Sequence, residues 1–499
     1  METQREKAKS WIPIFILCCF LILYVILRAH HLSLTFDEIV TYEIQKTFSL
    51  SDAGKTANTH LLNTYLISLS IYFFGASELA LRLPNVLALL VYLFAAIKIV
   101  SILGPNLRLH TFILLVAMPF LIDFFSLARG YGLGLSFMLL SVYYFLRFAT
   151  NNNVFTAMAS LVIAMVSVLG NYTMLNYFFP LMPILILMIL LHKNNAKSKA
   201  LEILLIILLG GFFLFIISPI LFELKNGGQL FFGGKTNIYF DTIYSIGKCF
   251  GYHMGYSKWA QGLFVACFFT SIIIAMAFMW RLIKKRALDP IGYLALLFLL
   301  SLIFVEIQNK VLATNYPVER AAILYYPLMI LVMFCGINSL LENKTVYLNK
   351  IVVALFCLHF LFTLNLTHCY SWRYDSGTKK MMADLKALVH KKIKLGIAIL
   401  NSPSVNFYRE KQALDSINIE LISDFWEYPF GIEEYNPCYY NADMYCNDTM
   451  FFDIKKIIRP DVDYYYLDNF FVEELRKANI ITKTIKEYPF SRTTLIQIN

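Results

Sequence analysis

The chain has 499 residues, of which 58% are hydrophobic and only 15% are charged. Because soluble proteins carry roughly a quarter charged residues, this composition excludes an ordinary soluble protein and indicates a chain embedded in a membrane. The formal net charge of +10 does not indicate a nucleic-acid-binding protein, since the basic residues form short clusters between apolar runs instead of one continuous patch.

Eleven apolar runs are each close to the roughly 20 residues that a membrane-spanning helix needs. They occupy residues 11–28, 80–103, 109–122, 130–148, 154–170, 174–191, 201–222, 262–283, 290–307, 321–341 and 347–367. The first run lacks a small-residue cleavage site, so we expect it to remain as an anchor. The expected fold class is a polytopic α-helical membrane protein with about 11 transmembrane helices.

Clusters of basic residues orient these spans. The stretches "HKNNAKSKA" from His192 and "RLIKKRALD" from Arg281 follow the sixth and eighth runs, and the positive-inside rule places both in the cytoplasm together with the N-terminus. The loop 29–79, the loop 223–261 and everything after about residue 368 then face the outside. We therefore expect a multi-pass protein of the bacterial inner membrane.

A further apolar segment, "LLNTYLISLSIYFFG" from Leu61, is a candidate for an additional span. If it crossed the membrane, every later loop would change sides and the lysine-rich loops would face outwards, against the positive-inside rule. The segment is also short and contains Asn63, Thr64, Ser68 and Ser70. We expect an interfacial helix on the outer leaflet, within the first outer loop.

From about Tyr370 the pattern changes to short alternating segments. The strand-like stretches are "KLGIAIL", "INIELI", "VDYYYLD" and "TTLIQIN", and the helical ones are "TKKMMADLKALVHKK", "SVNFYREKQAL" and "FVEELRKANI". This alternation predicts a small extracytoplasmic α/β domain at 370–499, after a transmembrane domain at 1–369. Cys438 and Cys446 are close enough in sequence to form a disulfide in such a compartment, and the sequence leaves their pairing open.

Three stretches, taken in order, are similar to a known family. They are the pair Asp37–Glu38 just past the first span, then "ANTHLLNTYLISLSIYFFGASELALRLPNVLALL", then "FSLARGYGLGLSFMLLSVYYF". This set resembles the GT-C glycosyltransferases, in the branch that contains protein O-mannosyltransferases and bacterial aminoarabinose transferases. In that branch the middle stretch runs as a His- or Lys-led helix, Phe-Gly, an acidic residue and Arg-Leu-Pro, here His60, Phe74–Gly75, Glu78 and Arg82–Leu83–Pro84. The later "YPVERAAILYYPL" also resembles a segment of many bacterial members, with Arg320 at the outer mouth of a span.

The resemblance implies an enzyme that transfers a sugar from a polyprenyl-phosphate carrier to an acceptor at the outer face of the membrane. Transfer with inversion needs a base that takes a proton from the acceptor hydroxyl, for which Asp37 is the first candidate and Glu38 the second. It also needs cations that neutralise the departing phosphate. The candidates for binding the donor phosphate are His60, Arg82, Arg129 and Arg320.

One departure from the branch affects the donor site. Mannosyltransferase-type members have "HPP" or "KPP" where this chain has "HLLN", so the rigidity that two prolines confer is absent. A divalent cation could share the phosphate-binding role, since outer-loop acids and His60 could ligate one, but the sequence shows no dedicated set of ligands. The sugar and the cofactor therefore stay open.

Structural roles compete with these assignments. Glu38 could anchor its loop, His60 could cap a helix, and Arg82 and Arg129 could extend from span ends toward the headgroups. At the level of the whole protein, the alternatives are a transporter or flippase for a lipid-linked glycan, and a non-catalytic assembly factor. A flippase should carry charges inside its spans and symmetric halves, whereas here the charges lie at the outer ends of spans and in outer loops. The partners implied are the lipid-linked donor, membrane lipid and an acceptor that is a lipid, a glycan or a protein.

Overall fold

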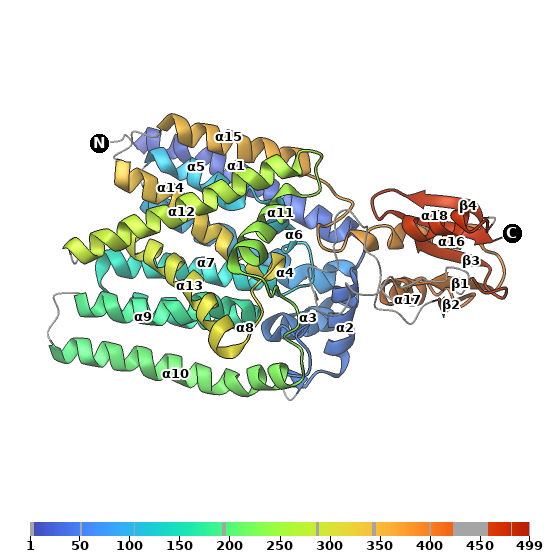
Figure 1. Cartoon of the computed structure of the whole chain (residues 1–499), viewed down its shortest axis with the longest axis horizontal. Helices are drawn as coiled ribbons and strands as arrows, with labels where there is room; N and C mark the ends of the chain where they lie inside the picture. The colour runs from blue at the N-terminus through green and yellow to red at the C-terminus, as the bar shows by residue number, and fades with distance from the viewer. Residues whose placement is uncertain are drawn as a thin grey trace. The chain divides into compact units, whose positions relative to one another are not determined.

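The computed structural model describes residues 4–49, 52–103, 105–191, 196–285, 289–341, 346–398, 401–422, 458–480 and 482–498 (Figure 1). These residues form two compact units. The first comprises Met1–Leu27 and Thr47–Leu364, and the second comprises Arg28–Lys46 and Asn365–Asn499. The second unit therefore contains an N-terminal segment besides the C-terminal residues, while the domain boundary expected at 369/370 stays a prediction. Cys438 and Cys446 lie outside the described residues.

The first unit is built from helices, most of them apolar along their whole length. Their bounds are α1 (Gln4–His31), α3 (Leu61–Phe74), α4 (Glu78–Ile102), α5 (Pro105–Val116), α6 (Pro119–Asp123), α7 (Tyr131–Asn151), α8 (Val154–Gly170), α9 (Leu175–Leu191), α10 (Ala196–Asn226), α11 (Ser245–Gly251), α12 (Ser257–Lys285), α13 (Pro290–Leu312), α14 (Tyr325–Leu341) and α15 (Val346–Thr363). Short turns of other helix types lie between them, namely η2 (Tyr172–Met174), η3 (Ile238–Tyr244) and η4 (Glu319–Ala322).

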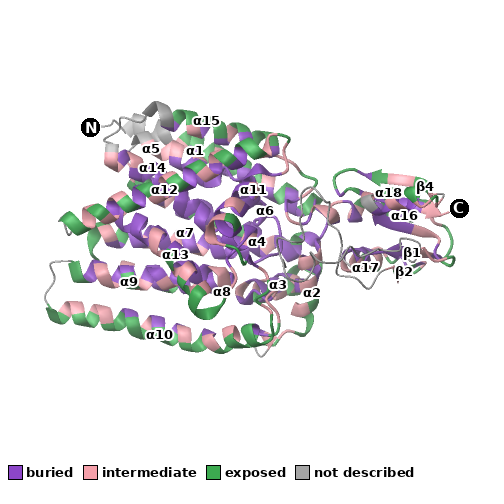
Figure 2. Cartoon of the chain, viewed as in Figure 1, coloured by how far each residue is buried: buried purple, intermediate pink, exposed green. Residues whose placement is uncertain are grey.

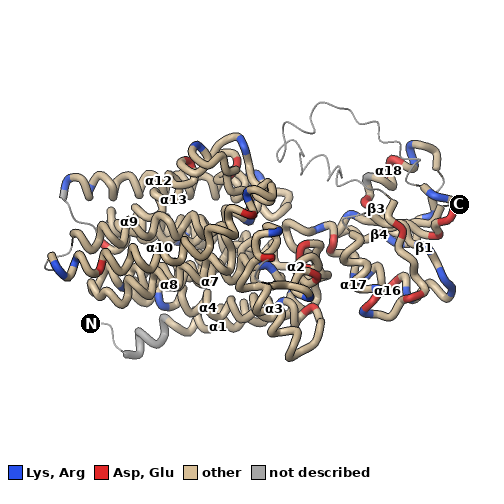
Figure 3. Tube along the Cα trace, turned by 90° about the horizontal axis from the view of Figure 1, so that it is seen from below, with Lys and Arg blue, Asp and Glu red and all other residues tan. Residues whose placement is uncertain are grey.

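Seven of these helical segments are long and apolar enough to cross a membrane. They are Trp11–His31, Glu78–Ile102, Tyr131–Asn151, Tyr172–Leu191, Ala196–Asn226, Ser257–Lys284 and Pro290–Leu312. The other expected spans coincide with shorter apolar helices in α5, α8, α14 and α15. The predicted polytopic helical fold is confirmed, and the count of eleven spans stays a prediction. Figure 3 shows the same pattern as a tan helical bundle whose charged residues gather toward the helix ends.

The third expected span, at 109–122, is divided in the structure. Helix α5 ends at Val116, Met118 is extended, and Pro119 opens the short helix α6. Proline disfavours helical geometry in the residue before it and has no N–H to continue the helical hydrogen bonds. The break between α5 and α6 could not be predicted from the apolar composition, because hydrophobicity alone does not distinguish one helix from two.

Helices α4, α7 and α8 form the inner part of the first unit, and α10 exposes most of one side (Figure 2). Helices α7 and α8 approach each other closely at two glycines, since a Cβ on Gly170 would lie 2.8 Å from the backbone nitrogen of Gly134. Further along, Ser141 donates a hydrogen bond to the carbonyl oxygen of Ser160 at 2.7 Å. Small residues and hydroxyl bonds of this kind hold helices together where apolar packing alone gives little specificity.

The short helix α3 turns its polar side inward. Asn63 and Thr64 are fully buried, whereas Tyr65, Leu69 and Tyr72 are exposed. An apolar outer face with polar groups facing the protein is the arrangement expected beside lipid. The predicted helix at this position is therefore present, and its place on the outer leaflet stays a prediction.

The second unit contains a five-stranded sheet of order β2-β1-β3-β5-β4. Its strands are β1 (Ile393–Ile397), β2 (Ile417–Leu421), β3 (Tyr464–Asp468), β4 (Thr482–Tyr488) and β5 (Thr493–Ile498). Strands β2, β1 and β3 are parallel, and β5 pairs antiparallel with both β3 and β4. Its helices are α2 (Phe36–Thr47), α16 (Thr378–Leu388), α17 (Ser402–Lys411) and α18 (Asn469–Lys477), with a short turn η5 (Arg373–Asp375).

The sheet of the second unit has two hydrophobic cores. Met381 and Leu385 of α16 and Val405 of α17 pack in one core with residues of β1, and Phe471 and Leu475 of α18 pack in the other. The alternation of strands and helices therefore formed the α/β unit that the sequence predicted. Strands β1, β2, β3 and β5 and helices α16, α17 and α18 were expected, and β4 and α2 were not.

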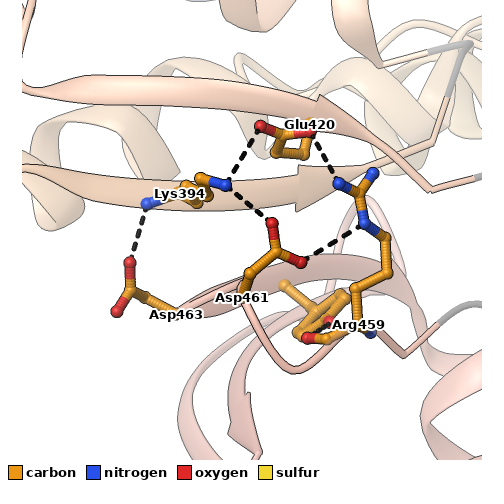
Figure 4. A network of polar contacts seen from close by, with 6 residues as sticks. Lys394, Glu420, Arg459, Asp461 and Asp463 are labelled. Carbon is orange, nitrogen blue, oxygen red and sulfur yellow. Dashed lines mark hydrogen bonds and ion pairs between the residues drawn. The ribbon is translucent and has the colours of Figure 1, made fainter.

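An ion network joins the first strands of this sheet (Figure 4). Lys394 on β1 lies 2.6 Å from Asp461 and 3.9 Å from Glu420 on β2. Arg459 lies 3.2 Å from Glu420 and 3.5 Å from Asp461, and Asp463 accepts a hydrogen bond from the backbone nitrogen of Lys394 at 2.8 Å. Because the ionic groups are partly exposed, we assign the network to strand registration more than to stability.

The membrane topology gives a direct test of the orientation. Cysteines introduced at Lys391 and at Lys284, both exposed, should react differently with a membrane-impermeant maleimide. We expect Lys391→Cys to be labelled in intact spheroplasts and Lys284→Cys only after lysis, because basic loops stay in the cytoplasm. The parent chain, which has its own cysteines, gives the background. Labelling of residue 391 only after lysis would overturn the topology.

Candidate functional site

The carboxylate pair that follows the first span opens helix α2 of the second unit. Thr35 is the N-cap, since the backbone nitrogen of Ile39 donates to its carbonyl oxygen at 3.1 Å. The side chains of Thr35 and Glu38 form a reciprocal capping box. Oε2 of Glu38 accepts from the backbone nitrogen of Thr35 at 2.9 Å, and Oγ1 of Thr35 accepts from the backbone nitrogen of Glu38 at 3.3 Å.

The two carboxylates of the pair differ in exposure. Glu38 is fully buried and one of its oxygens holds the backbone, whereas Asp37 is only half-buried. These contacts favour an anchoring role for Glu38, which the sequence left as one alternative. Asp37 is therefore the member of the pair that is partly exposed at the surface.

In the first unit, His60 caps helix α3 and lies in the interior. Its residue exposure is 4%, and neither ring nitrogen has a hydrogen-bond partner among the described residues. The ring packs edge-on against Tyr131, with 5.4 Å between the ring centroids. Burial lowers the pKa of His60 well below its usual value, and the positive charges of Arg129 and then Arg320 lower it further. The imidazole is therefore neutral at neutral pH and has polar atoms that a ligand can use.

Arg129 approaches His60 from the segment between α6 and α7. It is 2% exposed, and its Nη2 donates to Oδ1 of Asn58 at 2.7 Å. The residue before it is held as well, because Nδ2 of Asn63 donates to the carbonyl oxygen of Ala128 at 3.2 Å. Asn63 belongs to α3, so the helix that His60 caps also holds the backbone beside Arg129.

Arg320 lies in the short turn η4 after "NYPVE", and a neighbouring loop fixes that segment. The backbones of Gly234 and Tyr316 exchange two hydrogen bonds, of 2.9 Å and 2.8 Å. A Cβ at Gly234 would lie 1.9 Å from Cγ of Asp241, so only glycine fits there. Oγ1 of Thr242 then donates to the carbonyl oxygen of Pro317 at 2.8 Å. Together these bonds fasten the chain just before Arg320.

Two further contacts set the orientation of Arg320. The backbone nitrogen of Glu319 donates to Oγ of Ser245 at 2.9 Å, and Glu319 adopts a φ of 45°, which is uncommon for a residue with a side chain. The guanidinium of Arg320 lies over the ring of Phe232, 4.1 Å from its centroid. An aromatic face attracts a cation without neutralising its charge, so Arg320 is oriented while its charge is retained.

Arg82 is fully buried on helix α4. Asn85, three residues further on and therefore on the same face, donates to Oδ1 of Asn63 at 2.8 Å and accepts from the backbone nitrogen of Leu133 at 3.3 Å. These contacts link the Arg82 side of α4 to the segments that carry His60 and Arg129. We call Asn63 and Asn85 the asparagine pair.

The first unit thus brings three of the predicted residues together, because the charges of both Arg129 and Arg320 act on His60. Two guanidinium groups beside a neutral imidazole suit an anion with several oxygens, such as a phosphate. Asp37 and Glu38 are arranged within the second unit. Among the described residues no group of three His, Cys, Asp or Glu side chains could hold a metal ion, so no ligands are assigned to the divalent cation that the sequence left open.

Sequence reasoning missed the residues that hold the charged ones. Asn58, the asparagine pair and Phe232 were not singled out as supports. The available signal was the presence of asparagines inside apolar helices, where an amide is costly unless it is hydrogen-bonded. Phe232 gave no signal, because aromatic residues are common throughout this chain.

Comparison with known proteins shows the fold. No family model matches the sequence, and no curated protein matches it significantly. The structure is similar to that of ArnT from Cupriavidus metallidurans in the apo state, with 11% sequence identity, a TM-score of 0.52 and coverage of 98% of each chain. It is similar to the same protein bound to undecaprenyl phosphate, with 10% identity, a TM-score of 0.51 and the same coverage. The predicted resemblance to GT-C glycosyltransferases of the aminoarabinose transferase branch is thus confirmed at the level of fold.

Replacement of one member of the asparagine pair should destabilise the first unit. In Asn85→Leu, the side chain of Asn63 loses a donor and the backbone nitrogen of Leu133 loses an acceptor, both in the interior. We expect a loss of about 2 kcal/mol, seen as a lower unfolding temperature of the purified protein in detergent. Ser218→Ala is the control, because the hydroxyl of Ser218 donates to the carbonyl oxygen of Phe215 within its own helix. An unchanged unfolding temperature for Asn85→Leu would contradict the assignment.

Proposed function

We propose that this protein is an integral-membrane glycosyltransferase that takes a sugar from a polyprenyl-phosphate carrier and transfers it to an acceptor at the outer face of the membrane. The observation that carries the proposal is the buried, neutral His60 beside Arg129 and Arg320, whose two ring nitrogens find no hydrogen-bond partner in the part of the chain that the structure describes. One of the structures with the same fold is ArnT bound to undecaprenyl phosphate, which supports a ligand of this class.

The reaction needs a base and a stabilised leaving group. Asp37 takes the proton from the acceptor hydroxyl while the oxygen of that hydroxyl attacks the anomeric carbon of the donor sugar. The bond between that carbon and the phosphate oxygen breaks, and the electron pair stays on the phosphate. Attack from the side opposite the leaving group inverts the anomeric centre. Asp37 suits the role because it is the half-buried member of the acidic pair, while Glu38 is occupied with the helix cap.

The phosphate gains negative charge as the sugar leaves. Arg129 and Arg320 supply fixed positive charge for it, and the ring N–H of His60 supplies a hydrogen bond. Because Asn58 holds Arg129 and Phe232 holds Arg320, these groups do not need to reorganise during the reaction. In this proposal Arg82 does not bind the phosphate directly. It adds positive charge on the face of α4 that the asparagine pair links to the segments of His60 and Arg129.

The carrier also explains why the chain is membrane-embedded. A polyprenyl tail lies in the bilayer, so its phosphate lies at headgroup depth, where the loops between apolar helices meet water. His60 and Arg320 both lie in such connections, before α3 and before α14. We accordingly propose that the first outer loop and the second unit face the outside of a bacterial inner membrane.

Mass spectrometry tests the function. Envelope lipids, glycans and proteins would be compared between cells with the gene, cells without it and cells that carry Asp37→Asn. We expect a glycosylated species that only the wild-type gene produces, because loss of a general base lowers the rate about a hundredfold or more. Equal membrane levels of the variant protein are the control for folding. A glycosylated species at full level with Asp37→Asn would exclude Asp37 as the base, and carrier translocation without any glycosylated product would favour a flippase.

Arg320 gives a sharper test of the phosphate site. Arg320→Lys should weaken binding of undecaprenyl phosphate, used as the probe, nearly as much as Arg320→Ala, by about tenfold or more. The reason is that lysine cannot engage two phosphate oxygens at once or stack its charge flat on Phe232. Arg147→Ala is the matched control, since Arg147 is an exposed arginine that also lies near an aromatic ring, that of Tyr143. Full recovery of binding by lysine would mean that Arg320 acts only as a span-end charge.

A further inference from the structure

The segment that leads into helix α2 is bound by residues from the far end of the chain, all within the second unit. Oγ of Ser33 donates to the carbonyl oxygen of Ser376 at 3.0 Å and accepts from the backbone nitrogen of Lys379 at 3.2 Å. The backbone nitrogen of Leu34 donates to the hydroxyl of Tyr408 at 2.9 Å. These contacts place the start of α2 against α16 and α17.

The contact nearest to Asp37 involves a buried carboxylate, Asp375. Its Oδ2 accepts from the backbone nitrogen of Phe36 at 2.7 Å, and its Oδ1 accepts from Oγ of Ser404 at 3.2 Å. Asp375 is fully buried. Burying a carboxyl group costs free energy unless its oxygens are hydrogen-bonded. Loss of either hydrogen bond would therefore destabilise the folded unit.

Asp375 adds a further hydrogen bond at the N-terminus of α2. The first N–H groups of a helix have no partner within the helix and need one from elsewhere. Glu38 takes the N–H of the cap residue Thr35, Thr35 takes that of Glu38, and Asp375 takes that of Phe36. The backbone on both sides of Asp37 is thereby fixed by side chains.

We propose that Asp375, in the same unit, is a positioning residue for Asp37. The inference rests on the proposed role of Asp37 as the base. Burial, followed by the negative charges of Asp37 and Glu38, raises the pKa of Asp375 well above its usual value, which agrees with their proximity. A misplacement of a catalytic group by about 1 Å can cost a hundredfold in rate, so one such bond matters.

A second acid in the same unit provides a matched control. Asp384 on α16 accepts from Nζ of Lys486 at 2.9 Å and from the hydroxyl of Tyr488 at 3.0 Å. It therefore accepts two hydrogen bonds within the sheet unit, as Asp375 does, but these partners, Lys486 and Tyr488, lie on β4 and not on α2. A merely structural role for Asp375 predicts the same behaviour for the two variants.

The first measurement is hydrogen–deuterium exchange of the full-length protein in detergent, with or without the substitution. In Asp375→Ala, the amide of Phe36 should exchange about tenfold faster than in the wild type, because it loses its acceptor. Asp375→Asn should restore slow exchange, since the amide oxygen reaches the same N–H. Asp384→Ala should leave this peptide unchanged. Equal exchange in wild type and Asp375→Ala would overturn the proposal.

The second measurement is turnover with the polyprenyl-phosphate-linked form of the sugar that mass spectrometry finds on the product, together with binding of undecaprenyl phosphate. Asp375→Ala should lower kcat tenfold to a hundredfold, as roughly expected for a misplaced base, and leave binding of undecaprenyl phosphate within about twofold. Asp375→Asn should recover most of kcat, and Asp384→Ala should keep it. Asp375→Ser, whose side chain is polar but shorter, is measured beside the alanine variant. If one of the two variants does not fold, the kcat of the other tests the positioning role.

The outcomes separate this inference from the proposed function. If Asp37→Asn is inactive while folded Asp375→Ala or Asp375→Ser has normal kcat, the positioning role is wrong and the base assignment stands. If Asp384→Ala loses kcat as much as Asp375→Ala, the effect is general destabilisation and the positioning role is again wrong. If Asp37→Asn is fully active, the proposed function of Asp37 fails before Asp375 is considered.

Discussion

Two guanidinium groups that act on one buried imidazole repel each other, and the first unit depends on a backbone that resists this repulsion. Arg129 and Arg320 come from segments far apart in the sequence, and each is fastened by a different device. Asn58 and the asparagine pair hold the segment of Arg129, while the Gly234–Tyr316 backbone pairing holds that of Arg320. These neutral hydrogen bonds hold the two segments in place, so that the two positive charges can lie near the same imidazole.

The asparagine pair also accounts for a departure seen in the sequence. Where the mannosyltransferase-type sequences that this chain resembles have two prolines after the first residue of the motif, this chain has "HLLN", and a loss of rigidity was expected. The structure compensates with the last residue of that stretch, because Asn63 bonds both to Ala128 and to Asn85. Rigidity that proline supplies through its ring is supplied here by an amide bonded on two sides.

Much of the fold followed from periodicity and composition, and the failures have local causes. Long apolar runs and the alternating C-terminal segments were identified because burial dictates their residue types. Strand β4 was missed because Lys483, Lys486 and Glu487 interrupt its apolar pattern on an exposed edge of the sheet. Helix α2 was missed because more than half of its residues are polar, although the Thr35–Glu38 capping signature was present at its start. For the candidate site, the resemblance supplied His60, Arg129 and Arg320, but no local pattern could supply Asp375, which is 339 residues from its partner Phe36.

That separation has a consequence for the order of assembly. A ribosome adds about 5–20 residues per second, so the segment that opens α2 is made tens of seconds before the residues that bind it. During this interval the backbone N–H groups of Leu34 and Phe36 lack their partners Tyr408 and Asp375, and the apolar helices of the first unit are synthesised in between. The two long-range bonds at the start of α2 therefore form only after Asp375 and Tyr408 have been synthesised. A chain truncated before that point would contain the acidic pair but lack the partners that hold it. A ribosome that stalls early would therefore release a protein whose first loop lacks these hydrogen bonds.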